Sequence, residues 1–253
     1  MSDVASDKFL KKMEDVVVYG KLGVVQELLK NEEFANISKG SFDELLEKAI
    51  IFEEWGVLYH LLKREQIALL SAERLLELLE TAITYDRTDM FQKLMSLMGD
   101  TLSAKSFHDL LIAAIYEDGV EMFKELMKRG QIALLSAESL LELLRRAIWD
   151  DRTDMFQDLL KHEQIDHLSA KSFHHLLETA IIYDRTDMFQ ELMKREQIAL
   201  LSAESLCGLL EKARRKDRTD MFKELMEGIL YKMEKEQTTM DDLLVFAGYI
   251  PKM

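Results

Sequence analysis

The chain is poor in residues that cross-link a polypeptide or interrupt its helices. Among its 253 residues there is one cysteine, Cys207, and one proline, Pro251. A single cysteine excludes an intrachain disulfide and favours a reducing compartment. Because the only proline lies at the C-terminal end, no proline breaks a helix between residues 1 and 250. Uninterrupted helical structure is therefore permitted along the whole chain.

Long apolar runs and positive charge are also scarce. No run of 18 apolar residues occurs, and the N-terminal stretch MSDVASDKFLKKM lacks the apolar core of a secretory signal, so we expect a cytoplasmic protein without a membrane span. Thirty-three basic residues stand against 47 acidic ones, for a net charge of −14. This excess disfavours nucleic acid and anionic membranes as partners, because phosphate neutralisation supplies most of the affinity for both. It is compatible with a basic protein partner.

Recognisable catalytic and metal-binding motifs are missing as well. The sequence has no phosphate-binding glycine loop, nucleophile elbow or kinase signature. Cys207 has no histidine partner at a fixed spacing, which argues against a catalytic thiol. His162 and His167 are five residues apart instead of four, and the neighbours His174 and His175 are expected to point apart on a helix. We therefore expect no enzymatic activity, no cofactor and no metal site.

What the sequence does contain is a repeat. A serine opens each of six copies, with spacings of 33, 32, 33, 33 and 33 residues between Ser38, Ser71, Ser103, Ser136, Ser169 and Ser202. A fixed period of this length is typical of a solenoid, in which stacked supersecondary units bury their faces on one another. Below, the serine is position 1 of each repeat.

The first half of each repeat predicts an amphipathic helix. Position 5 is apolar, positions 8 and 9 are both leucine, and position 12 is always alanine. Together with an isoleucine at position 13 in five copies, these residues form one stripe of an α-helix. The serine is expected to cap the start of that helix. A leucine before the serine and an apolar residue four after it, such as Leu102 and Phe107, have the spacing of a hydrophobic staple.

The second half predicts another helix. Position 16 is acidic in all six copies, and four copies read Asp-Arg-Thr-Asp-Met-Phe from this position. An acidic residue with a second carboxylate three residues later suits the positive start of a helix, so position 16 is expected to be its N-cap. Apolar pairs four residues apart, such as Met90-Phe91 and Leu94-Met95, then form one helical face.

These patterns predict an all-α fold, a right-handed α-solenoid of about seven 33-residue helix-turn-helix repeats with terminal caps. We expect one repeat domain over residues 1–253. Its parts are an N-terminal capping unit at residues 1–37, six helical hairpins at 38–235 and a C-terminal capping helix at 236–253.

The period, the hairpin and two segments resemble ankyrin repeats. These segments are residues 20–29, GKLGVVQELL, and 118–130, DGVEMFKELMKRG. The chain departs from that family in lacking its threonine-proline-leucine-histidine helix start and the β-hairpin finger between repeats. The resemblance implies a protein-binding array, and several intracellular bacteria and viruses direct such arrays at host proteins.

A second resemblance concerns the repeat opening Leu-Ser-Ala-Glu-Ser-Leu-Leu, which is similar to that of the bacterial TAL-effector DNA-reading repeats. Those repeats carry a glycine-rich loop that reads bases. Here the corresponding loop reads Tyr-Asp-Arg-Thr-Asp, as at residues 85–89, and would place carboxylates near phosphate. DNA reading is therefore disfavoured.

Two groups of residues are candidates for contacting a partner. Aromatic residues occur where the two helices of a repeat meet, and such rings dominate interface hot spots. Tyr116 and Trp149 are the better candidates, because Phe52, Tyr85 and Tyr183 have staple spacing to an apolar residue five positions on. The second group occupies the positions of the first helix that vary most between copies: His108, Arg145, Arg146, His174 and His175.

The leading functional prediction is a non-enzymatic protein–protein interaction scaffold that binds a partner on its concave or turn-side surface. One alternative is an effector of an intracellular bacterium, delivered into a host cytosol to engage a host protein. Others are a self-associating structural protein, since the sequence leaves the oligomeric state open, and an enzyme with an unrecognised site.

Overall fold

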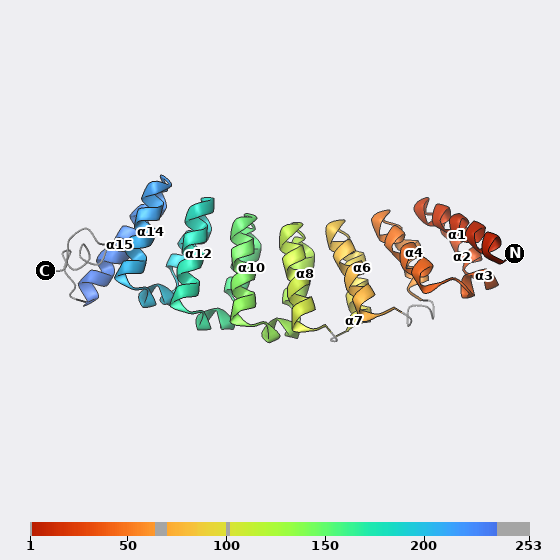
Figure 1. The fold of residues 1–253 in the computed structure, drawn as a ribbon, viewed down its shortest axis with the longest axis horizontal. Coiled ribbons are helices and arrows are strands. Elements are labelled where there is room, and N and C mark those ends of the chain that lie inside the picture. The colour runs from red at the N-terminus through yellow and green to blue at the C-terminus, as the bar shows by residue number, and fades with distance from the viewer. Residues whose placement is uncertain (1, 64–69, 100–101, 237–253) are drawn as a thin grey trace. The chain divides into compact units, whose positions relative to one another are not determined.

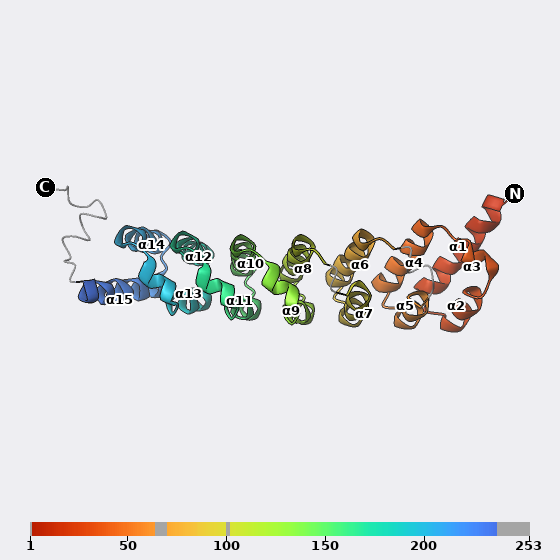
Figure 2. The ribbon, with the colours of Figure 1, turned by 90° about the horizontal axis from the view of Figure 1, so that it is seen from below.

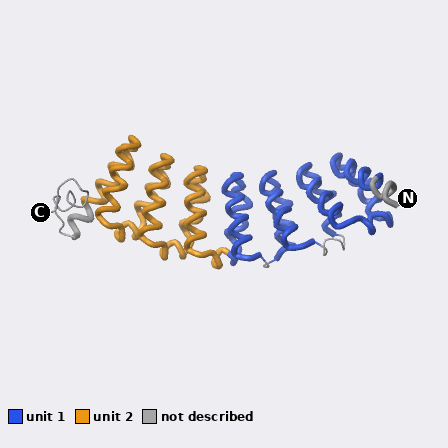
Figure 3. The backbone as a smooth tube through the Cα atoms, viewed as in Figure 1, with its two compact units in different colours: residues 1–131 blue, residues 132–253 orange. Residues whose placement is uncertain are grey.

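Helices form all the regular secondary structure in the described part of the chain. The computed structural model describes residues 2–63, 70–99 and 102–236, which form fifteen α-helices and three short 3₁₀ helices (Figure 1). The all-α prediction is confirmed. The chain divides into two compact units, unit 1 (residues 1–131) and unit 2 (residues 132–253) (Figure 3). The single-domain organisation stays a prediction.

Three helices precede the first repeat serine. They are α1 (Ser2–Val18), α2 (Leu22–Leu28) and α3 (Glu32–Ala35). Helix α1 packs against α2 and against the first helix of the next repeat. Met13 and Val17 of α1 are fully buried, so this predicted capping unit covers the apolar face of the repeat that follows.

Six helical hairpins follow. Their first helices are α4 (Lys39–Ile51), α6 (Ala72–Thr84), α8 (Ala104–Tyr116), α10 (Ala137–Trp149), α12 (Ala170–Tyr183) and α14 (Ala203–Arg215). Their second helices are α5 (Trp55–Leu61), α7 (Thr88–Met98), α9 (Val120–Met127), α11 (Thr153–Leu160), α13 (Thr186–Met193) and α15 (Thr219–Glu236).

The hairpins stack in register within each unit. Each first helix packs against its own second helix and against the first helix of the neighbouring repeat, as in α6·α8 and α12·α14. The second helices pack on one another in the same way, as in α7·α9. Within each unit the first helices form one layer and the second helices another (Figure 2). This arrangement of neighbours is that of an α-solenoid.

The core is the apolar stripe that the repeat predicts. In α8 the residues at positions 5, 8, 9, 12 and 13 are fully buried: Phe107, Leu110, Leu111, Ala114 and Ile115. Burying one such large side chain contributes about 1.5–3 kcal/mol, and the same positions repeat along each unit. The alanine carries a single methyl group, which lets backbones of neighbouring elements approach closely.

The six serines cap the first helices as predicted. Each hydroxyl accepts a hydrogen bond from the backbone N–H three residues later, as Ser169 does from Ser172 at 3.1 Å. The same bond occurs at Ser38, Ser71, Ser103, Ser136 and Ser202. At the start of α8, Leu102 and Phe107 are both buried, which is consistent with the predicted staple.

The prediction for position 16 is wrong. Its six acidic residues have left-handed backbone, with φ between 52° and 61°: Glu53, Asp86, Asp118, Asp151, Asp184 and Asp217. Gly20 holds the same place in the capping unit, with φ of 59°. Aspartate and glycine are among the residues that adopt this conformation most readily. Position 16 therefore ends the first helix instead of starting the second.

The hydrogen bonds identify this ending as a Schellman motif. The N–H of Arg87 donates to the Ala82 carbonyl at 2.7 Å, and the N–H of Asp86 donates to the Ile83 carbonyl at 3.0 Å. These two bonds satisfy carbonyls that a helix end otherwise leaves free. The N-cap of the second helix is one residue later, at Arg87, Arg152 or Arg185, and no side chain caps it.

Short 3₁₀ helices connect successive repeats. They are η2 (Gly130–Leu134), η3 (Glu163–His167) and η4 (Glu196–Leu200). The sequence did not predict these 3₁₀ helices. The C-terminal capping helix is predicted at residues 236–253. Residue 236 is the last residue of α15, and the rest of the predicted helix lies outside the described residues. Among helices in the described ranges, none has the length and apolar content needed to cross a bilayer.

Candidate functional site

The end of each first helix and the start of its second helix form what we call the turn edge, positions 14 to 20 of a repeat. It contains the left-handed acidic residue at position 16 and, in five repeats, a second acidic residue at position 19. Neighbouring turn edges lie side by side within a unit, because the helices that carry them pack against one another. The turn edge lies at the opposite end of the first helix from the 3₁₀ connections.

The predicted aromatic candidates lie on the turn edge and remain accessible. Tyr116 is 58% exposed, Trp149 is 57% exposed and Tyr85 is 42% exposed. The staple inferred for Tyr85 depended on Asp86 as the N-cap, so the corrected helix start removes it. Trp149 and the half-buried Tyr183 stack, with ring centroids 5.0 Å apart and planes at 25°. Rings from two neighbouring repeats of unit 2 thus form one surface.

Arginines at position 17 tie three of the turn edges to the preceding repeat. In unit 2 the Arg185 guanidinium lies 3.1 Å from the Asp151 carboxylate, and Arg218 lies 2.8 Å from Asp184. In unit 1, Arg87 lies 2.7 Å from Glu53. Arg185 also donates Nε to the Ile148 carbonyl at 3.1 Å. Ionic hydrogen bonds to a helix C-terminus are favourable because the free carbonyls there carry partial negative charge.

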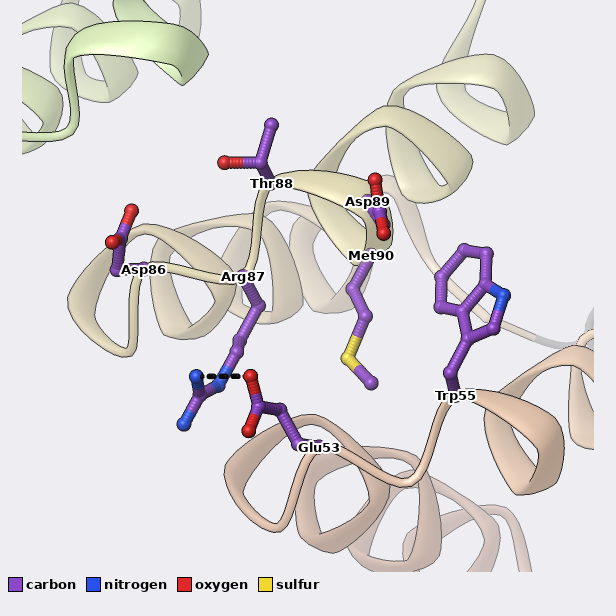
Figure 4. A pocket seen from close by; sticks show the side chains of 7 residues that line it. All are labelled: Glu53, Trp55, Asp86, Arg87, Thr88, Asp89 and Met90. Atoms are coloured by element: carbon purple, nitrogen blue, oxygen red, sulfur yellow. Dashed lines mark hydrogen bonds and ion pairs between the residues drawn. The ribbon is translucent and has the colours of Figure 1, made fainter.

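An acidic pocket occurs at equivalent places in the two units. In unit 1 it has a volume of about 370 Å³ and lies between Glu53 and Trp55 of one repeat and positions 16 to 20 of the next. Figure 4 shows Arg87 reaching toward Glu53, with Asp86 before the start of α7 and Asp89 in its first turn. In unit 2 the pocket is about 200 Å³, and Asp151, Asp184 and Asp187 contribute carboxylates. Such a pocket can accept a cationic or hydrogen-bond-donating group.

The variable-position candidates differ in their accessibility. The His108 side chain is only 13% exposed and lies 3.6 Å from Asp109. Arg146 forms an ion pair with Asp150, four residues later on the same helix. Arg145 is exposed. None of these three residues takes part in the stacking of Trp149 and Tyr183. His108 is too buried to offer a large contact surface.

His174 and His175 lie close together, contrary to the expectation that they point apart. Their ring centroids are 5.9 Å apart. His175 Nδ1 lies 3.4 Å from a carboxylate oxygen of Glu178, and Lys212 from α14 pairs with the other oxygen. The hydrogen bond from Lys212 lowers the pKa of Glu178, and burial lowers the pKa of His174. Burial raises the pKa of the Cys207 thiol, which favours the protonated, unreactive form.

Sequence reasoning missed the position-17 arginines and the side chains around His175. The signal for the arginines was present, because an acidic residue and an arginine recur 34 residues apart, as Glu53 and Arg87 do. Glu178 could have been found from its spacing of four residues from His174, which places both on one helical face. Lys212 could not, because its contact depends on how α12 and α14 stack.

No protein-family model, curated protein or solved structure matches the chain. The sequence and fold together define a protein of helix pairs with a period of about 33 residues.

Proposed function

We propose that the chain is a non-enzymatic protein-binding scaffold, and that its turn edge holds a basic segment of a partner protein. The observation that carries this proposal is the stacked pair Trp149–Tyr183 beside the pocket that contains Asp151 and Asp184. Each ring is within two residues of one of these carboxylates along the chain. A surface that combines exposed rings with carboxylates suits an arginine- or lysine-rich segment.

The chemistry of the two parts is complementary. An arginine side chain can lie over an indole or phenol ring through a cation–π contact and reach a carboxylate with its guanidinium. Neighbouring repeats offer the same acidic positions again, so one extended segment could contact several repeats at once. The net charge of −14 speeds the encounter with a basic partner and makes it sensitive to salt.

We also propose a relationship to the ankyrin repeats, supported by the 33-residue hairpin and by the segments at residues 20–29 and 118–130. In that relationship the 3₁₀ helices replace the β-hairpin fingers. It favours protein binding over the self-association alternative. Delivery into a host cell stays a prediction.

A random peptide library selected on the purified chain tests the proposal. Selected peptides should be rich in arginine and lysine, and their binding should weaken as salt is raised. The double variant Trp149→Ala/Asp187→Asn should lose at least about 1–2 kcal/mol of affinity, as expected for hot-spot truncation. The matched control is Leu134→Ser/Leu200→Ser, which changes two exposed apolar side chains at the ends of the 3₁₀ helices η2 and η4.

The outcomes separate the surfaces. Peptides that bind the control variant but no longer bind Trp149→Ala/Asp187→Asn support binding on the turn edge. Selection of acidic or neutral peptides would contradict the proposed site. So would peptides whose binding is lost only in Leu134→Ser/Leu200→Ser. Concentration-dependent light scattering of the unliganded chain would instead favour the self-associating alternative.

A further inference from the structure

One helix of unit 2 brings together three side chains that can each donate an atom to a metal ion. His174, His175 and Glu178 lie on α12, and one potential ligand atom from each lies within 4.8 Å of the others. We propose that these three residues bind a divalent transition-metal ion of the zinc class. The site is separate from the turn edge, because Glu178 and Tyr183 are five residues apart, about 7.5 Å along the helix axis.

The spacing of the three residues suits a single ion. His174 and Glu178 are four residues apart and His175 and Glu178 are three apart, so both histidines flank the glutamate on the helix surface. In a tetrahedral site with bonds of about 2.1 Å, neighbouring ligand atoms are about 3.4 Å apart. The distance from His175 Nδ1 to Glu178 Oε2 is already 3.4 Å. Binding then requires the imidazole of His174, which has a ligand atom within 4.8 Å of this pair, to move closer to it.

The donor set indicates the class of metal. Two imidazole nitrogens and one carboxylate oxygen suit zinc, nickel, cobalt or copper, whereas calcium and magnesium prefer oxygen ligands. Three protein ligands leave a coordination position for water or for a group from another molecule. The His175 side chain is 46% exposed and that of Glu178 is 28% exposed, so an ion can reach them from solvent.

Lys212 from α14 completes the surroundings of the site. Its ammonium pairs with Oε1 of Glu178, while Oε2 faces His175. A hydrogen bond to the distant oxygen of a metal-binding carboxylate orients that carboxylate, as neighbours of metal ligands commonly do. The same ammonium also repels a cation. Glutamine at this position keeps a hydrogen-bond donor but removes the charge, so Lys212→Gln should strengthen metal binding, whereas a purely structural role for Lys212 predicts no such gain.

These residues occupy positions 6, 7 and 10 of their repeat, and other repeats have different residues there. The preceding copy has Leu141, Glu142 and Arg145, and the following copy has Cys207, Gly208 and Glu211. The repeat frame therefore tolerates changes at all three positions. Substitutions that remove the ligands are expected to leave the fold intact, which far-UV circular dichroism checks.

The test uses the full chain, titrated with Zn²⁺ by calorimetry and with Co²⁺ by visible absorption. We expect one ion per chain and a Co²⁺ ligand-field spectrum. The variants His174→Ala/His175→Ala and Glu178→Gln should each weaken Zn²⁺ binding by at least about tenfold. Lys212→Gln should tighten it. The matched control is His162→Ala/His167→Ala, which removes two other histidines of the same unit and should leave the affinity unchanged.

Three results would overturn the proposal. They are a wild-type chain that binds neither ion, an affinity unchanged in both ligand variants, and an equal loss in the control variant. If Lys212→Gln binds Zn²⁺ no more tightly than the wild type, the place assigned to Lys212 beside the ion is wrong.

Discussion

The Arg185 guanidinium lies 3.1 Å from the Asp151 carboxylate of the preceding repeat. The same arginine donates hydrogen bonds to the carbonyls of Ile148 and Trp149, at the C-terminal end of α10. One side chain therefore links two repeats and holds the backbone that carries a candidate ring. Stability and the shape of the turn edge depend on the same contact.

Replacement of Arg185 should loosen the junction between α10 and α12. Arg185→Ala is expected to lower the free energy of unfolding by about 1–2 kcal/mol, because charge-assisted hydrogen bonds to the helix end are lost. Arg185→Lys should recover only part of this, because lysine lacks the planar fork that reaches two carbonyls and a carboxylate. Urea denaturation measures both changes. In a double-mutant cycle with Asp151→Ala, the ion pair itself should account for less than about 1 kcal/mol. Full stability in Arg185→Ala would contradict the linking role.

The left-handed backbone at position 16 makes a second prediction. Asp86 has φ of 52°. It suits a test of backbone conformation because the next repeat has Gly119 at position 17, instead of an arginine that would link to the acidic residue at position 16. Glycine adopts this conformation without steric cost, whereas a β-carbon without a helpful polar group costs about 1–2 kcal/mol. Asp86→Gly should therefore be about 1 kcal/mol more stable than Asp86→Ala in thermal or urea unfolding. Equal stabilities would mean that the backbone is not held left-handed in solution.

Asp86 and Gly20 also show why the sequence predicted the turn only in part. An aspartate between two helices suits either the N-cap of the second helix or the left-handed end of the first, and these places differ by one residue. Gly20 holds the same repeat position, and glycine is more strongly enriched after a helix than before one. That comparison favours the left-handed end of the first helix, which is what the structure shows. The helices, their buried stripe and the serine caps depend on local rules and could be predicted.

The candidate sites were less predictable, because they depend on contacts between repeats. Trp149 and Tyr183 could be recognised as rings near a turn, but their stacking requires the spacing of α10 and α12. The proximity of Glu178 to His174 could be predicted from helical periodicity, because the two residues are four positions apart. The contact of Lys212 with Glu178 joins residues 34 positions apart and follows only from the stacking of two repeats.

The serine caps predict a matched pair of substitutions. Ser169→Ala removes the acceptor for the Ser172 N–H and should cost about 1 kcal/mol of stability. Ser169→Asp should restore most of that loss, because its carboxylate can accept the same bond and suits the positive helix start. Urea denaturation of both variants measures the difference. If the Ser169→Asp variant is as unstable as Ser169→Ala, the serine contributes to stability through something other than this hydrogen bond.

Glu211 makes the final prediction, which concerns pH. Hydrogen bonds from Arg214 and Arg215 lower the pKa of its carboxyl to about 2. Because the folded-state pKa lies below the ordinary value of 4.5, the carboxylate contributes stability above about pH 4.5 and loses it as the pH falls toward 2. A carbon-detected NMR titration should show a midpoint well below 4.5 that rises in Arg214→Gln/Arg215→Gln. High salt should also raise it, because the pair is exposed and therefore screened. A midpoint near 4.5 in the wild type would show that the arginines do not hold the carboxylate in solution.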